Sequence, residues 1–161
     1  MFDRDQFREL ITDVLVAMGL DSPGAVDLLM GTAAQESRLG TYLRQKGKGP
    51  ALGVFQMEPA TERDLWDNYL VYNPVLVAKL TAACGVRGPG PHLRWNLAYQ
   101  IAMARLHYRR IKEPLPAAGD VLALAGYWKR HYNTPLGKGT VEEFAGSYRR
   151  LVLGNTKGGT P

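Results

Sequence analysis

The sequence predicts a mainly α protein with at most a small β-hairpin. Apolar residues recur at helical spacing in seven segments, and proline, glycine or capping residues separate these segments from one another. The chain has 161 residues, of which 45% are hydrophobic, so it can bury one substantial core and is too short for two comfortable domains. We therefore expect one domain that spans residues 1–161.

The first two helices have clear boundary signals. Residues 5–20 keep a helical period of apolar side chains until Gly19, which is expected to end this covering helix. Ser22 followed by Pro23 combines a cap with a proline at the first helical position, so a second helix is expected to begin there. We expect Gly40 to end this second helix.

Glu36 lies on the apolar face of the second helix. It shares that face, by helical spacing, with four apolar residues: Ala25, Leu28, Leu29 and Ala33. A carboxyl group that points inward has a raised pKa and can hold a proton near neutral pH, as a general acid must. The alternative is that Glu36 turns outward to water at the end of the helix.

Residues 41–50 are expected to form an exposed loop or a small hairpin at the rim of a cleft, because Gly47 and Gly49 interrupt the segment. The loop also carries three basic residues, Arg44, Lys46 and Lys48. Pro59 then starts a helix over residues 61–70. Asn73 and Pro74 precede a further helix that continues to Ala83.

Three helices are expected in the second half of the chain. After a turn-rich loop over residues 85–91, a long helix runs to about Arg110, and another spans about residues 118–131. A last helix, about residues 141–153, starts at Thr140, whose spacing to Glu143 fits a capping box. The Gly-Gly-Thr-Pro tail is expected to be frayed.

Composition limits the classes of function. The net charge of +5 favours a polyanionic partner, but no nucleic-acid-binding motif accompanies the basic clusters, so we expect no nucleic acid. No apolar stretch is long enough for stable membrane insertion, and the N-terminus lacks a secretory signal, so synthesis in the cytoplasm as a soluble chain is expected. Cys84 is the only cysteine, and the three histidines are widely spaced, so we expect no disulfide, metal or cofactor.

Two segments carry a resemblance to a known family. Gln35-Glu36-Ser37, followed by Ala51-Leu52-Gly53-Val54-Phe55-Gln56-Met57-Glu58-Pro59-Ala60-Thr61, resembles the signature of the lysozyme-like superfamily, especially soluble lytic transglycosylases and goose-type lysozymes. Asn96, and Tyr132 to Gly137, resemble its third and fourth motifs, although Gln100 stands at a usual glycine and Met103 at a usual tyrosine. The resemblance covers about residues 22–137 and leaves residues 1–20 and 138–161 as peripheral additions.

The resemblance implies a lysozyme-like (α+β) fold, with a small or vestigial hairpin beside the helix of Glu36. It also implies cleavage of the β-1,4 bond between N-acetylmuramic acid and N-acetylglucosamine in peptidoglycan, with Glu36 as general acid. The substrate-binding residues that it implies are Ser37, Gly53, Phe55, Gln56, Tyr132 and Asn133. Each polar one has a structural alternative, since Ser37 can bond backbone, Gln56 can pin a loop, Tyr132 can pack in the core and Asn133 can end a helix.

The role of Glu58 distinguishes two possible reactions. A lytic transglycosylase uses one glutamate and forms a 1,6-anhydro product, whereas an inverting lysozyme needs a second carboxylate to hold a water. Glu58 is the candidate second carboxylate, because alternation along an extended segment would place it on the same side as Gln56. The alternative is that Glu58 caps the helix at Pro59.

A wall-cleaving motif without a signal peptide most resembles phage lysis or virion-associated enzymes. Such an enzyme is made in the host cytoplasm and reaches the cell wall through a holin or as part of a virion. The alternative from another class is a non-catalytic virion or cell-wall-binding protein that keeps the sugar groove for adhesion.

Overall fold

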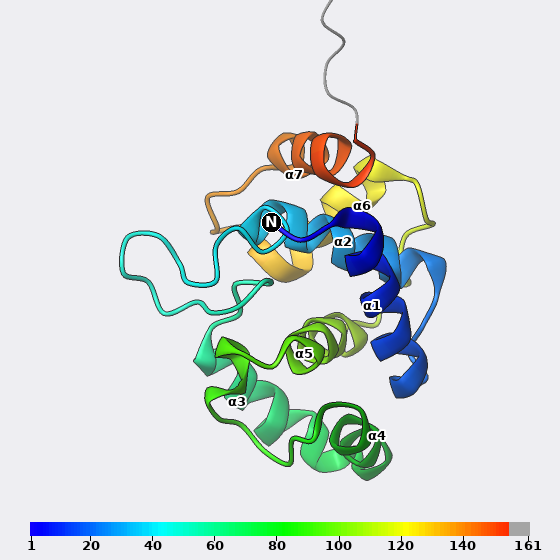
Figure 1. Cartoon of the computed structure of the whole chain (residues 1–161), viewed down its shortest axis with the longest axis vertical. Helices are drawn as coiled ribbons and strands as arrows, with labels where there is room; N and C mark the ends of the chain where they lie inside the picture. Colours follow the sequence, from blue (N-terminus) through cyan, green and yellow to red (C-terminus); the bar gives the residue numbers. More distant parts are fainter. Residues whose placement is uncertain (155–161) are drawn as a thin grey trace, which may run out of the picture.

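A computed structural model of the chain describes residues 1–154, and the frayed tail expected from the sequence lies outside this range. The expectation of a mainly α fold is confirmed (Figure 1). The α-helices are α1 (Arg4–Met18), α2 (Pro23–Ser37), α3 (Pro59–Asn68), α4 (Pro74–Cys84), α5 (Leu97–Arg109), α6 (Val121–Trp128) and α7 (Val141–Ser147). Short 3-10 turns η1 (Leu70–Tyr72) and η2 (Pro91–Arg94) lie between helices, and π-helical turns η3 (Lys129–Asn133) and η4 (Tyr148–Val152) directly follow α6 and α7.

The small hairpin expected beside the second helix is reduced to two isolated bridges in the described residues. Arg44 pairs with Leu52, and Leu52 pairs in turn with Met57. No sheet forms among residues 1–154. The segment between α2 and α3 is therefore an irregular loop that folds back on itself.

Several helix boundaries follow the capping residues in the sequence. Gly19 ends α1 in the left-handed conformation, the Ser22 hydroxyl caps α2, and Thr140 and Glu143 form the expected capping box. The prediction that Gly40 ends the second helix is wrong, because Arg38 already adopts the left-handed conformation. The helix expected from residue 118 begins later, at Val121, since Asp120 caps it.

Helix α2 runs through the middle of the molecule and packs against α1, α5, α6 and α7 (Figure 1). Residues 24–34 are all buried. The sequence predicts that only one face of this helix is buried, whereas side chains on all of its faces are buried because other helices surround it. Pro23 is exposed at the start of α2, and at the other end the C-terminal turn, which carries Glu36, reaches the surface.

The two end helices, expected to be peripheral, contribute to the same hydrophobic cluster as the middle of the chain. Phe7 and Ile11 of α1 are buried, and α1 packs on α4 and α5. Phe144 and Tyr148 of the C-terminal segment are buried against α2. None of the helices in residues 1–154 combines the length and apolar character that a membrane crossing requires.

Gly31 permits the close approach of α7 to α2. A Cβ at this position would lie well inside van der Waals distance of the Phe144 ring and 2.9 Å from Cδ2 of Tyr148. We expect Gly31→Ala to destabilise the protein by about 1–3 kcal/mol, because the two rings would have to move. Chemical denaturation measures this change.

Gly146→Ala is the matched control, since Gly146 is also helical but has no atom within 4 Å of its Cβ position. We expect it to be neutral or to stabilise by up to about 1 kcal/mol through helix propensity. Equal effects of the two substitutions would contradict the role of close packing at Gly31.

Candidate active site

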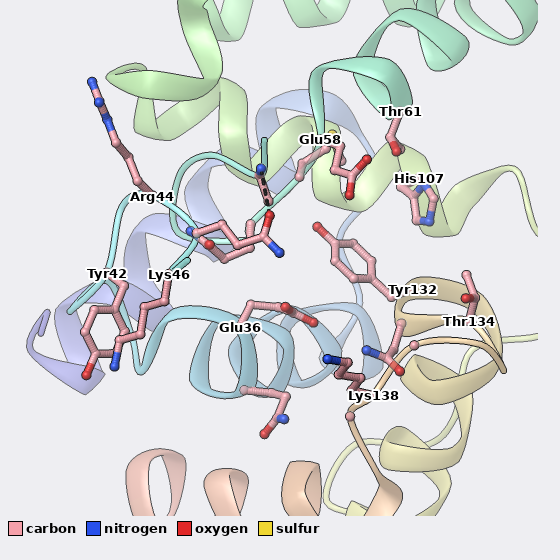
Figure 2. A pocket seen from close by; sticks show the side chains of 18 of the residues that line it. Glu36, Tyr42, Arg44, Lys46, Glu58, Thr61, His107, Tyr132, Thr134 and Lys138 are labelled. Carbon is pink, nitrogen blue, oxygen red and sulfur yellow. Dashed lines mark hydrogen bonds between the residues drawn. The ribbon is translucent and has the colours of Figure 1, made fainter. Parts of the chain in front are cut away.

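A groove of about 840 Å³ opens at the C-terminal end of α2. Its walls come from α2, the loop before α3, the first turn of α3, α5, and the segment that follows α6 (Figure 2). The polar and charged side chains that line it are Gln35, Glu36, Arg38, Tyr42, Arg44, Gln45, Lys46, Gln56, Glu58, Thr61, His107, Tyr132, Asn133, Thr134 and Lys138.

Glu36 lies at the base of this groove and is only partly exposed. Burial raises the pKa of its carboxyl group from 4.5 to about 7, while a hydrogen bond from Trp128 opposes part of that rise. The indole Nε1–H of Trp128 donates to Oε1 at 2.9 Å. Glu36 thus faces the groove and is protonated in about half of the molecules near pH 7.

Trp128 fixes the direction of the Glu36 side chain, and sequence reasoning missed it. Its ring is fully buried, lies 5.3 Å from the Phe144 ring centroid, and leaves no room for a Cβ at Gly139, which would come within 2.6 Å of Cη2. One signal could have found Trp128: it precedes Tyr132 by one helical turn, so both face the same side.

Gln56 lines the groove from a tight turn. Its Nε2 donates to the Gly53 carbonyl at 2.7 Å, so it also pins the loop, as the structural alternative proposed. Gly53 has φ +74°, and a Cβ there would lie 2.5 Å from Oε1 of Gln100. That same oxygen accepts the backbone N–H of Val54 at 2.8 Å. Gln100, which departs from the family pattern, therefore holds this turn.

Glu58 also lines the groove, but not for the reason given by the sequence. The segment is turned rather than extended, since Gln56 has φ +47° and its N–H bonds to the Gly53 carbonyl. Glu58 is exposed at the N-cap position of α3, yet its side chain makes no capping hydrogen bond. Figure 2 shows Glu36 and Glu58 on opposite sides of the groove, with Tyr132 beside them.

Tyr132 and Asn133 reach the groove from the π-helical turn η3. The Tyr132 hydroxyl donates to the Phe55 carbonyl at 2.8 Å, and its ring packs against His107 and Tyr108. Burial, with Glu36 nearby, raises the pKa of this phenol, which favours the protonated donor. Asn133 Oδ1 accepts from Lys129 Nζ at 2.7 Å, which fixes its amide.

Three expected substrate-binding residues do not line the groove. Ser37 is fully buried, and its hydroxyl donates to the Ala33 carbonyl and accepts from the Gly40 N–H, as the structural alternative proposed. The Phe55 ring is in the core, so only its carbonyl acts near the site. Gly53 is buried and shapes the turn.

His107 lines the groove and was not assigned a role from the sequence. Its Nε2–H donates to the His131 carbonyl at 2.9 Å, and its Nδ1 accepts from Arg110, whose guanidinium pairs with Asp64. Burial, followed by the charge of Arg110, lowers its pKa to about 4. This histidine is therefore neutral near pH 7 and supports η3 rather than supplying a proton.

No group of three or more metal-ligating side chains gathers within residues 1–154. Comparisons of the chain with family models, curated proteins and solved structures found no match.

Substituting Trp128 is expected to raise the pKa of Glu36. In Trp128→Phe the hydrogen bond that stabilises the carboxylate is lost while most of the ring remains, so the ionisation midpoint should move above the present value of about 7. Carbon-13 NMR of the labelled glutamate carboxyl groups, assigned with Glu36→Gln, measures that midpoint.

Trp66→Phe is the matched control, because the Trp66 indole donates to the Tyr99 hydroxyl instead. We expect it to leave the Glu36 midpoint unchanged. A downward shift in Trp128→Phe would contradict the role assigned to its N–H group.

Proposed function

We propose that this protein cleaves the β-1,4 glycosidic bonds of peptidoglycan strands between N-acetylmuramic acid and N-acetylglucosamine, with Glu36 as the general acid. The observation that carries the proposal is a carboxyl group with a pKa of about 7 at the base of an open polar groove. The motifs around Glu36, Gln56 and Tyr132 support it, and they extend the proposal to a lysozyme-like fold.

The first step requires a proton on the bridging oxygen of the scissile bond. Glu36 supplies this proton, and its ionised form is then stabilised by the Trp128 N–H group. An acid with a pKa near the working pH can both give and recover a proton in each cycle. Gln56, Tyr132 and Asn133 border the same space with amide and hydroxyl groups suited to sugar hydroxyls.

Two alternative routes for the second step of the reaction are compatible with the groove. In a lytic transglycosylase, Glu36 removes the proton from the 6-hydroxyl of the muramyl sugar, which closes on its own anomeric carbon. In an inverting hydrolase, Glu58 activates a water on the opposite face of the sugar ring. The exposed, uncapped Glu58 side chain on the far side of the groove supports the second route.

The site of action that fits this chemistry is the bacterial cell wall. On the motif resemblance we propose a role in phage lysis or in a virion, with access through a holin or a particle.

Glu36→Gln is expected to abolish release of muropeptides from purified peptidoglycan, because the amide has no proton to donate. In the unsubstituted protein, kcat/KM should fall about tenfold per pH unit above a pH of about 7, as Glu36 loses its proton. Chromatography of released fragments measures both effects.

Glu142→Gln is the control for Glu36→Gln, since Glu142 is exposed on α7 and does not line the groove. Undiminished release in Glu36→Gln would contradict the assignment. Binding to peptidoglycan without release in the unsubstituted protein would support the non-catalytic wall-binding alternative instead.

Mass analysis of the products separates the two second steps. Hydrolysis by Glu58 predicts reducing-end products and a loss of activity of at least about a hundredfold in Glu58→Gln. Transglycosylation predicts 1,6-anhydro products and activity within a few-fold of the unsubstituted protein in Glu58→Gln. Reducing ends with full activity in Glu58→Gln would contradict the role of Glu58.

A further inference from the structure

One side of the groove is cationic, and its charges have no acidic partners in the described chain. Arg38, Arg44 and Lys46 line this side, and none of them lies within 4 Å of a carboxylate of residues 1–154. Four arginines elsewhere in residues 1–154 do pair with a carboxylate, as in Arg8 with Asp27 and Arg130 with Glu113, and what marks the groove is that three cations without such a partner lie on one side of it. The groove therefore gathers positive charge that the fold does not neutralise.

Tyr42 organises two of these cations. Lys46 Nζ lies 3.8 Å from the centroid of the Tyr42 ring, and Arg38 Cζ lies 5.8 Å from it. Figure 2 shows Tyr42 and Lys46 together on the loop side of the groove, with Arg44 on the same side but directed away from the Tyr42 ring, and Glu58 and His107 on the other side. Like charges held near one ring repel each other, so a bound anion between them would be stabilised.

The other side of the groove suits a uniformly anionic polymer poorly, because it carries acidic side chains as well as the cation of Lys138. Glu58 is an exposed carboxylate there, and Glu36 at the base ionises only at a free-energy cost. A nucleic acid, with a phosphate at every residue, would meet these two acids. A glycan whose neutral sugars carry anionic substituents at intervals can place the sugars against Glu36 and Glu58 and the anions against the basic side.

We propose that Arg38 and Lys46 beside the Tyr42 ring, together with Arg44 on the same side of the groove, form a subsite for carboxylate groups carried by the substituents of the glycan strand. This inference rests on the proposed function, and it adds that the enzyme selects acidic, peptide-bearing strands over neutral ones. The contacts are charge-assisted and lie at an exposed surface, so salt weakens them.

The test uses two forms of one substrate. Soluble uncrosslinked peptidoglycan is compared with the same material after its carboxylates are converted to methylamides with carbodiimide and methylamine. For the unsubstituted protein we expect kcat/KM to be roughly five- to tenfold higher on the acidic form at low salt, as two or three exposed ion pairs allow. This ratio should approach one at about 0.5 M salt.

In the double variant Arg44→Gln/Lys46→Gln, the ratio is expected to fall to about one to two at low salt. Arg87→Gln, which removes one exposed charge from the loop between α4 and η2, is the control for loss of a charge outside the groove and should keep the full ratio. A ratio unchanged in the double variant, or a ratio of one in the unsubstituted protein, would overturn the subsite while cleavage itself stands. Absence of cleavage on both forms would overturn the proposed function and the subsite together.

Discussion

The fold buries the Glu36 carboxyl group at the end of α2, so its ionisation costs free energy. The acid–base chemistry of the groove depends on that cost. Burial at the end of α2 raises the pKa to about 7, a change that corresponds to about 3 kcal/mol. The Trp128 N–H group limits the cost by stabilising the carboxylate. The result is an acid that exchanges its proton near neutral pH instead of one that is permanently charged or permanently neutral.

The rest of the structure keeps this acid in place. α2 is enclosed by four helices, so its last turn is a rigid support, and the close contact at Gly31 lets α7 complete that enclosure. Gln100 holds the turn that presents Gln56, and Tyr132 ties η3 to the same turn through the Phe55 carbonyl. Elements far apart in the sequence therefore meet at the groove through direct hydrogen bonds.

The sequence predicts the helices well because caps and apolar periods are local signals, as at Ser22 and Thr140. It also places Glu36, Gln56, Glu58, Tyr132 and Asn133 at one site, since their motif spacing reflects a shared geometry. It misassigns Ser37 and Phe55, because motif membership does not reveal which way a side chain points. It misses Trp128 and Gln100, because their roles depend on long-range contacts. The Trp128 contact spans 92 positions of the sequence, and the Gln100 contact spans 46.

The central claim is that the folded protein holds a proton on Glu36, and the pH dependence of unfolding tests it. A carboxyl whose pKa is 4.5 when unfolded and about 7 when folded lowers the stability as pH rises through that interval, because only the unfolded chain releases the proton there. Relative to the unsubstituted protein, Glu36→Gln should therefore gain about 3 kcal/mol of unfolding free energy between pH 4.5 and 8. A difference between the two proteins that stays constant over this range would contradict the claim.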